Sequence, residues 1–391
     1  MNYIPYGRQS VSEEDIQAVV KVLRSDFLTQ GPVVQQFETA FASRVGAEFA
    51  ISTTNATSAL HLACLALGVG PGDVVWTSAV SFVASANCAL YCGASVDFVD
   101  IDAKTSNMSI DDLRRKLAAA NLTGSLPKVV IPVHLSGEPC DMESIHRLSK
   151  EYGFKVVEDA SHAVGAKYRN TVVGDCAYSD ITVFSFHPVK IITTGEGGIA
   201  TTNNSELASR MARLRSHGIT RDPREMTQQP DGPWYYQQLE LGFNYRLTDI
   251  QAALGLSQLE SLDEFLRRRH EIANFYDDAL SGSRFQTPER DPSNYSSLHL
   301  YVIQVPGDKM GNRNQVFEAL RANGVLVNLH YIPIYKHPFY QQFGYSSENF
   351  PNSETYYRRA ISLPIFPGLS QANAEAVIDL LGQPIGHQTL F

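Results

Sequence analysis

Residues 49–202 alternate between short runs typical of β-strands and longer runs typical of α-helices. The strand-like runs are rich in β-branched and aromatic residues and cover residues 49–54, 74–78, 95–102, 128–137, 154–161 and 181–186. Helix-like runs separate most of them, at residues 55–73, 82–93, 111–120 and 142–153. Strands joined by helical crossovers lie parallel in one sheet, so the alternation predicts an α/β layered domain with a large, mostly parallel sheet. Ligands bind such sheets at the carboxyl ends of the strands.

Helical patterns flank this region on both sides. Ser12 and Asp15 have the spacing of a capping box before a helix at residues 13–26, and Pro32 opens another helix. Thr248 and Gln251 form a second capping box, and the apolar residues after them keep a helical period over about thirty residues. A helix of that length is expected to join two domains.

A smaller α/β unit is expected at the C-terminal end. Strand patterns occupy residues 297–305 and 325–332, and helical patterns occupy residues 313–324 and 373–382. We therefore expect a large domain over residues 11–255 and a small C-terminal domain over residues 256–391, which the N-terminal segment 1–10 joins. Residues 220–242 are rich in Pro, Asp, Gln and Gly and are expected to form a long loop, of the kind that often carries function.

Composition excludes several classes of protein. The chain has 391 residues, of which 43% are hydrophobic and 19% charged, so a large core is expected and disorder is not. The net charge of −9 argues against a nucleic-acid partner or an anionic membrane. Five cysteines without paired CxxC spacing predict neither a disulfide framework nor a metal site. The first residues lack a basic-then-apolar signal and no apolar run approaches ~18 residues, so we expect a cytoplasmic protein.

Lys190 lies in a loop that suits an amine nucleophile. It follows the strand-like run 181–186 and precedes the glycine-rich turn 195–198, with apolar or hydroxyl neighbours up to Glu196. Low polarity disfavours the charged ammonium, and the neutral amine can attack a carbonyl carbon. A surface-loop lysine without a chemical role is the alternative that this stretch leaves open.

Polar groups also occupy two other strand ends. Asn55, Ala56, Thr57 and Ser58 open a helix directly after a strand, where free amides and the helix dipole favour a phosphate group. A plain helix N-cap explains the same residues. Asp159 ends another strand, where its carboxylate can hold a protonated ring nitrogen or cap the next turn.

Together these features resemble the DegT-type sugar aminotransferases, a family with the fold-type I architecture of pyridoxal-phosphate (PLP) enzymes. The motifs that carry the resemblance run from residue 28 to residue 260 in the family's order: LTQGP, NATSALHLA, SFVASAN, PVHLSGEPCDM, VEDASHAVGA, SFHPVK with TTGEGG, RSHG and NYRLTDIQAALGLSQL. The segments IPYGRQS, SDFLTQG and HYIPIY further resemble the branch of the family that serves pseudaminic-acid synthesis.

The resemblance implies roles for residues around the cofactor. Lys190 would bind PLP covalently and later move the proton between cofactor and substrate, and Asp159 would pair with the pyridine nitrogen. Phe82 would stack on the ring, and His162 would contact the ring hydroxyl, where many relatives carry Gln.

The resemblance also implies a phosphate site and a homodimer. Ala56 and Thr57 would hold the cofactor phosphate through their backbone amides, together with Ser185. Asn244 would reach the phosphate of the neighbouring subunit, so the active sites would be shared across a homodimer.

The same resemblance implies a set of residues that contact the substrate. The candidates are Tyr6, Asp26, Phe27, Leu28, Thr29, Ala56, His187, His217, Asn244, Asn328, Leu329, His330 and Tyr331. For His187 and His217, a structural hydrogen bond is the alternative to a substrate contact. His61, inside a helix, is expected to be structural.

The resemblance implies a transamination in two halves. L-glutamate would leave as 2-oxoglutarate and convert the cofactor to pyridoxamine phosphate (PMP). The amine would then pass to C4 of a UDP-linked 4-keto-6-deoxy-N-acetylhexosamine. No arginine is indicated for the glutamate carboxylate.

Four alternatives to this activity stay open. They are a 4-aminotransferase for a GDP- or dTDP-linked keto-sugar, a non-catalytic sensor with the same fold, a dehydratase with the fold and a dinucleotide-binding dehydrogenase. The dehydratase would carry His at position 190, and the dehydrogenase would need a G-x-G-x-x-G turn that the chain lacks.

Overall fold

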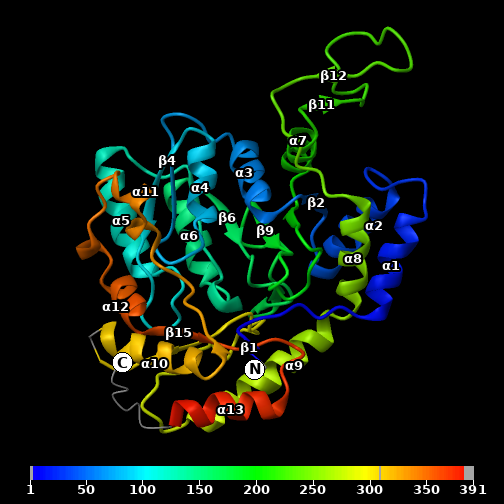
Figure 1. Ribbon diagram of the computed structural model, residues 1–391. Helices are drawn as coiled ribbons and strands as arrows, with labels where there is room; N and C mark the ends of the chain where they lie inside the picture. The colour runs from blue at the N-terminus through cyan, green and yellow to red at the C-terminus, as the bar shows by residue number, and fades with distance from the viewer. Residues whose placement is uncertain (1–2, 308–309, 383–391) are drawn as a thin grey trace.

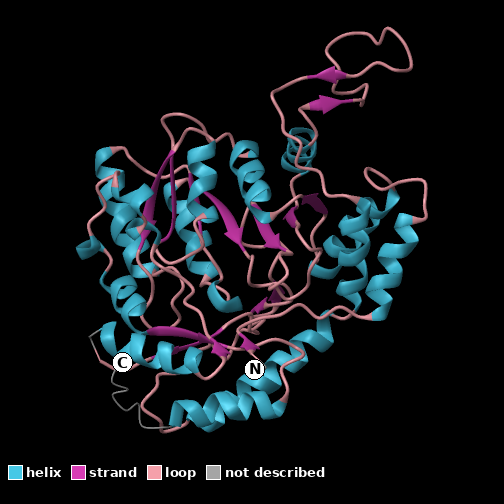
Figure 2. Ribbon diagram, viewed as in Figure 1, coloured by secondary structure: helices cyan, strands magenta, loops and turns pink. Residues whose placement is uncertain are grey.

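The computed structural model describes residues 3–307 and 310–382. A seven-stranded sheet forms the centre of the molecule, with the strand order β2-β10-β9-β6-β5-β3-β4 (Figures 1 and 2). Its strands are β2 (Phe49–Thr53), β3 (Val74–Ser78), β4 (Ser95–Val99), β5 (Val129–Ile131), β6 (Lys155–Asp159), β9 (Ile181–Ser185) and β10 (Gly198–Thr202). All run parallel except β10, which is antiparallel to both of its neighbours, β2 and β9. The predicted mostly parallel sheet is confirmed.

Helices cover both faces of this sheet. One face packs against α3 (Ala56–Ala66), α4 (Ala84–Tyr91) and α7 (Ser205–Arg215). The other face packs against α2 (Pro32–Val45), α5 (Ile110–Thr123), α6 (Met142–Tyr152) and α8 (Asp249–Glu260). Successive strand residues point to opposite faces, so Val183 belongs to the first core and Phe184 to the second. The result is a three-layer α/β unit.

Both predicted capping boxes are present. The Ser12 amide donates to Asp15 Oδ2 (2.9 Å) and the Asp15 amide donates to Ser12 Oγ (3.2 Å), which opens α1 (Glu13–Leu23). Thr248 and Gln251 open α8 in the same way. The single long helix expected after Thr248 is wrong, because α8 ends at Glu260 and α9 (Leu262–Leu280) begins anew. The Ser261 amide bonds to the Gln258 carbonyl (3.1 Å), a tight turn that separates the two helices.

The C-terminal part has its own core. β13 (Tyr301–Gln304) pairs antiparallel with β15 (Ala360–Leu363), and α9, α10 (Met310–Ala322) and α13 (Gln371–Gly382) contribute to the same core. The strand expected at residues 325–332 is wrong beyond Leu326. Only β14 (Val325–Leu326) is a strand, and it pairs in parallel with β1 (Ile4–Pro5) at the other end of the chain. Beyond it, Asn328 Oδ1 accepts the Leu329 amide (2.8 Å), a local bond in an irregular segment.

One stretch of the C-terminal part returns to the large sheet. Ile334, Tyr335, Tyr340 and Phe350 are buried in the core formed by α3 and α4. This stretch includes α11 (Pro338–Gln341) and precedes α12 (Pro351–Arg359). The expected division into residues 11–255 and 256–391 stays a prediction.

A long arm projects from the body of the molecule after α7 (Figure 1). It carries a short antiparallel ribbon of β11 (Ile219–Thr220) and β12 (Gln237–Gln238), so the long loop expected at residues 220–242 is confirmed. A second short ribbon pairs β7 (Lys167–Tyr168) with β8 (Thr171–Val172). Among the helices of the described residues, none is long and apolar enough for a membrane crossing.

Candidate active site

A cavity of about 860 Å³ opens at the carboxyl ends of the parallel strands. Asp159 ends β6, Ser185 ends β9 and Phe82 follows β3, and all three side chains line the cavity. This is the place that the sheet topology predicted for a ligand.

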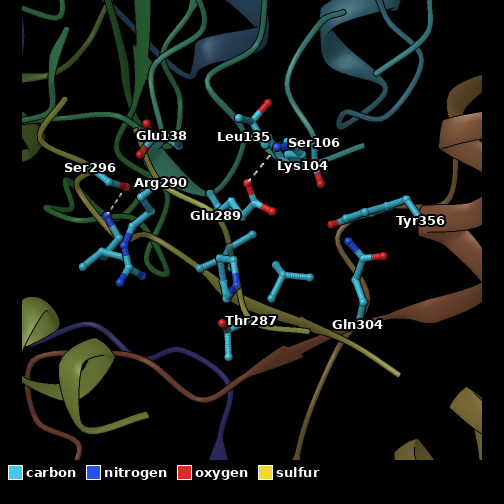
Figure 3. A pocket seen from close by; sticks show the side chains of 16 residues that line it. Lys104, Ser106, Leu135, Glu138, Thr287, Glu289, Arg290, Ser296, Gln304 and Tyr356 are labelled. Carbon is cyan, nitrogen blue, oxygen red and sulfur yellow. Dashed lines mark hydrogen bonds and ion pairs between the residues drawn. The ribbon is translucent and has the colours of Figure 1, made fainter. Parts of the chain in front are cut away.

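A second cavity is far smaller. It has a volume of about 40 Å³ and lies between the loops around Lys104 and Leu135 and the segment from Thr287 to Gln304 (Figure 3). Lys104 and Glu289 form an ion pair across it (3.9 Å). The space suits a few water molecules, so the cavity at the strand ends is the candidate active site.

Lys190 is presented by a tight turn after β9. The Lys190 amide donates to the His187 carbonyl (2.8 Å), and the Phe186 amide donates to the Gly197 carbonyl (2.9 Å), which closes the loop at its base. The side chain lines the cavity. Burial lowers the pKa of Lys190 to about 8, against the opposing influence of the Asp159 carboxylate. The neutral, nucleophilic fraction of the amine near neutral pH is therefore much larger than for an unperturbed lysine with a pKa of 10.5.

The Asp159 carboxylate is buried and held by two donors. Ser85 Oγ donates to Asp159 Oδ2 (2.6 Å), and the Ser161 amide donates to Asp159 Oδ1 (3.1 Å). The residue is 4% exposed, and it lines the cavity. Its position at the end of a central strand fits the role of a fixed anion opposite a cationic ring nitrogen.

The N-terminus of α3 forms an anion cradle. Asn55 Oδ1 accepts the Ser58 amide (2.9 Å), which leaves the Ala56 and Thr57 amides without a partner in the described part of the chain. Ser185 faces Gly198 across β9 and β10, and a Cβ on Gly198 would lie 2.5 Å from the Ala56 nitrogen. The strand thus approaches the helix start only because residue 198 is glycine. Free amides, a hydroxyl and the helix dipole together suit a phosphate group.

Three buried histidines face the cavity: His162, His299 and His330. Burial lowers the pKa of each, to about 3 for His330, and the nearby Lys190 adds to the effect. All three rings are therefore neutral at physiological pH. His299 Nδ1 is buried and has no hydrogen-bond partner among the described residues, which leaves it available to a ligand.

Most of the expected substrate residues also line this cavity. Tyr6, His187 and the segment 328–331 all reach it. The ring of Tyr6 lies 5.0 Å from that of His330, and the ring of Tyr331 lies 6.0 Å from that of Phe82. The cavity is therefore built jointly by the N-terminal segment, the segment 328–331 and the central sheet.

The other expected contacts lie outside this cavity. Asp26, Phe27, Leu28, Thr29, His217 and Asn244 do not line it. They fall into two groups along the segment 244–248: Thr29 bridges to Thr248, and Asn244 bridges to Ser216, next to His217. Phe27 and Leu28 are 54% and 45% exposed. We call these six residues the outer cluster.

Several lining residues were missed from the sequence. Ser81, Ser161 and Tyr245 line the cavity, and Ser85 lies directly behind it. His299, whose role the sequence leaves undecided, lines it as well. Ser81 and Ser85 belong to the quoted motif SFVASAN, whose serines stand four apart, one helical turn. His61 is buried as expected, but it also lines the cavity and lies 3.4 Å from the Tyr245 hydroxyl.

These residues fit PLP. Lys190 supplies the amine, Asp159 the partner for a ring nitrogen, and the start of α3 the donors for a phosphate. Phe82 is 56% exposed at the cavity, so its face is open to a planar ring.

Comparison with known proteins supports this interpretation. Residues 9–382 match the model of the DegT/DnrJ/EryC1/StrS aminotransferase family. The spore coat polysaccharide biosynthesis protein SpsC of Bacillus subtilis is 39% identical over 97% of this chain and 96% of its own length. The UDP-4-amino-4,6-dideoxy-N-acetyl-beta-L-altrosamine transaminase of Campylobacter jejuni is 37% identical over the same shares of the two chains.

Solved structures are similar over the whole chain. Helicobacter pylori PseC, an aminotransferase involved in the biosynthesis of pseudoaminic acid, has a TM-score of 0.89 and 31% identity, covering 97% of this chain and 98% of its own. A putative sugar aminotransferase from Streptococcus pneumoniae, solved in PLP and PMP forms, has TM-scores of 0.87 and 0.88, with 30% identity, 97% of this chain covered and 97% and 96% of its own. The predicted fold-type I architecture and the PLP cofactor are confirmed. The chain belongs to the DegT/DnrJ/EryC1/StrS family of PLP-dependent sugar aminotransferases.

Proposed function

We propose that the protein transfers the amino group of L-glutamate to C4 of a UDP-linked 4-keto-6-deoxy-N-acetylhexosamine. The product is UDP-4-amino-4,6-dideoxy-N-acetyl-beta-L-altrosamine, and the other product is 2-oxoglutarate. The observation that carries the proposal is the single cavity that joins Lys190, Asp159 and the α3 cradle to the segment 328–331. The Campylobacter jejuni relative, named for this activity, supports the choice of sugar.

The residues divide the chemistry among them. Bound PLP supplies the electron sink that stabilises negative charge on the substrate carbon. Lys190 Nζ would hold the cofactor at rest and, once released, would carry the proton from the glutamate carbon to the cofactor side in the first half and from the cofactor side to the sugar carbon in the second. Its pKa of about 8 suits both directions of this transfer near neutral pH. Asp159 would keep the ring nitrogen protonated, and the amides of Ala56 and Thr57, with Ser185, would anchor the phosphate.

The cavity is large enough for a sugar nucleotide. Its volume of about 860 Å³ lies at the upper end of ordinary ligand sites, which span ~300–1,000 Å³. Tyr6, Asn328 and His330 would supply polar groups for the acceptor. Lys190 is the single lysine or arginine among the described residues that line the cavity. The diphosphate and the glutamate carboxylate therefore need cations from elsewhere.

We propose a second copy of the chain as their source. The outer cluster is exposed, does not line its own cavity and contains Asn244, which by the family resemblance would reach the neighbour's phosphate. Arg246 follows Asn244 closely, and its only hydrogen bond to a described residue is to Ser216 Oγ (3.4 Å), so its charge is free for a ligand. A homodimer would bring the outer cluster of one subunit to the cavity of the other.

The test is product analysis with kcat/KM over a panel of UDP-, GDP- and dTDP-linked 4-keto-sugars, with glutamate as donor. A site that hydrogen-bonds the uracil and acetamido groups rejects analogues without them, by as much as ~10⁴-fold. Preference for a GDP- or dTDP-linked sugar would show that the acceptor is different while the aminotransferase activity stands. SpsC is 39% identical and its name refers to spore coat polysaccharide and not to this sugar, so a different acceptor is the rival to exclude. Absence of turnover with every sugar, despite bound cofactor, would favour the non-catalytic sensor.

A further inference from the structure

Two serines stand in line behind the Asp159 carboxylate. Ser85 Oγ lies 2.6 Å from Asp159 Oδ2, and Ser81 Oγ lies 2.7 Å from Ser85 Oγ. All three side chains are buried, with exposures of 2% for Ser81, 0% for Ser85 and 4% for Asp159. Ser81 reaches the cavity, whereas Ser85 does not.

The direction of these hydrogen bonds follows from the number of protons that each group can donate. An ionised carboxylate only accepts, so Ser85 donates its one hydroxyl proton to Asp159. Ser85 can then only accept from Ser81, which donates in turn. The Phe82 carbonyl also lies near Ser85 Oγ, but at 3.3 Å it is the weaker acceptor. The result is an ordered relay, Ser81 to Ser85 to Asp159.

The relay fixes the plane of the carboxylate. Ser85 holds Oδ2, and the Ser161 amide holds Oδ1 (3.1 Å), so the group cannot rotate without breaking a bond at either end. The same short segment, residues 81–85, also carries Phe82, whose side chain is exposed to the cavity. One turn at the start of α4 thus holds both the stacking ring and the donor to the anion.

We propose that Ser85, oriented by Ser81, is a positioning residue that aims Asp159 at the pyridine nitrogen of the cofactor. The inference rests on the proposed pairing of Asp159 with that nitrogen. Neither serine touches the reacting atoms. Their contribution is to keep one carboxylate orientation populated before the cofactor binds, which stabilises the protonated ring nitrogen.

The test compares two ligands of the apoenzyme that differ at one atom. PMP carries the ring nitrogen, and 1-deaza-PMP carries a C–H in its place. Dissociation constants are measured for both with the wild-type chain and with Ser85→Ala, Ser85→Thr, Ser81→Ala and Asp159→Ala. PMP labelled with ¹⁵N at the ring gives a second readout, since its chemical shift reports protonation of the nitrogen.

Ser85→Ala is expected to weaken PMP binding about 10-fold and deaza-PMP binding less than about 2-fold, because the lost bond acts only through the ring nitrogen. Ser81→Ala should also weaken PMP binding more than deaza-PMP binding, but by a smaller factor than Ser85→Ala. Ser85→Thr keeps the hydroxyl and should retain the preference for PMP. In Ser85→Ala, the ¹⁵N signal should shift toward that of the neutral ring.

Each contrary outcome is distinct. Equal weakening of both ligands in Ser85→Ala would show a merely structural role and overturn the inference. If Ser85→Ala does not fold, equal weakening of both ligands in Ser81→Ala would overturn it in the same way. If Asp159→Ala leaves the preference for PMP intact, the pairing of Asp159 itself is wrong, and the inference falls with it. If Asp159→Ala loses the preference for PMP and neither serine variant does, the pairing of Asp159 stands and the positioning role of the serines is wrong.

Discussion

His162 Nε2 lies 3.0 Å from the hydroxyl oxygen of Tyr331. The Ser136 amide donates to His162 Nδ1 (3.3 Å), so Nδ1 is an acceptor and Nε2 carries the ring proton. His162 therefore donates to Tyr331, and the Tyr331 hydroxyl keeps its own proton for a ligand. The histidine expected to contact the cofactor hydroxyl thus also orients a donor that faces the cavity.

Tyr331→Phe removes that donor. We expect kcat/KM for the keto-sugar to fall about 10–100-fold, because one hydrogen bond to a buried ligand is lost. PMP affinity should change little, since the α3 cradle and Asp159 are intact. Steady-state kinetics and PMP titration check this. Tyr335→Phe, in the core near Phe350, is the matched control, and an equal loss of activity in both variants would argue against a specific role for Tyr331.

The rate at which apoenzyme takes up PLP should depend on pH through Lys190. Its pKa is lowered by burial to about 8, and only the neutral amine attacks the cofactor aldehyde. Reconstitution followed by visible absorbance should therefore accelerate with rising pH and level off above pH about 8. The Asp159 carboxylate raises this pKa, so Asp159→Asn should move the midpoint to lower pH. A midpoint near pH 10 in the wild-type chain would contradict the lowered pKa of Lys190.

The same shift affects stability. The native pKa of about 8 lies below the value of 10.5 for an unperturbed lysine, so between these two pH values the unfolded chain binds more protons than the native apoenzyme. The contribution of Lys190 to the free energy of unfolding therefore rises with pH across this window. Urea titrations give the free energy of unfolding of the wild-type apoenzyme and of Lys190→Met at pH 7.5 and pH 9.5. The free energy of the wild-type chain relative to the variant should rise between these two pH values.

Borohydride should fix the cofactor to Lys190. Reduction of the carbon–nitrogen double bond makes the link permanent, and peptide mapping then identifies the labelled residue. Lys190→Ala should bind cofactor only non-covalently and lose turnover, because both the attachment and the proton carrier are gone. A label on Lys167 or any other lysine would be incompatible with the assignment.

Gly198→Ala tests the cradle at the start of α3. The added Cβ would lie 2.5 Å from the Ala56 nitrogen, so the strand and the helix start must separate. We expect PLP affinity to fall about 10-fold or more and the unfolding free energy to fall by ~1–3 kcal/mol. Gly70→Ala is the control, because a Cβ there meets nothing within 4 Å. Unchanged PLP affinity in Gly198→Ala would remove this strand from the phosphate site.

A shared active site can be tested by complementation. An Asn244→Ala chain mixed with a Lys190→Ala chain should recover activity in heterodimers, because one of the two sites then holds both intact residues. The two chains must exchange freely between dimers. Different tags on the two chains, followed by co-purification, establish that heterodimers have formed. No recovery in confirmed heterodimers would mean that both residues act within one chain.

Much of the large sheet could be predicted from local sequence. β2, β3, β6 and β9 coincide with runs of β-branched and aromatic residues, and the capping boxes marked the starts of α1 and α8. The antiparallel direction of β10 could not be predicted, because its residues 199–202, IATT, have the same pattern whether the strand lies parallel or antiparallel to β9. The break between α8 and α9 at Ser261 likewise could not be predicted, because the apolar residues keep a helical period across it.

The site residues likewise fall into those that local sequence indicated and those that it did not. Lys190 and Asp159 could be singled out because Asp159 ends a strand, and Lys190 follows one, at the edge of the sheet where ligands bind. Phe82, Ser185 and the substrate segment came only from the family resemblance. His299 and Ser85 needed tertiary structure, because their importance lies in which atoms they face, His299 with an unpartnered Nδ1 and Ser85 with the carboxylate of a residue 74 positions away.

The parallel pairing of β1 with β14 has a consequence for synthesis of the chain. Ile4 leaves the ribosome long before its partner Val325, which lies more than 300 positions later in the chain. Contacts so distant in sequence form late, and domains emerging from the ribosome fold in order from the N-terminus. The large sheet can therefore assemble while Tyr6 still lacks the neighbours that hold it at the cavity. A nascent chain that extends past β10 but not yet to β14 is therefore expected to have the strands of the sheet without the complete cavity.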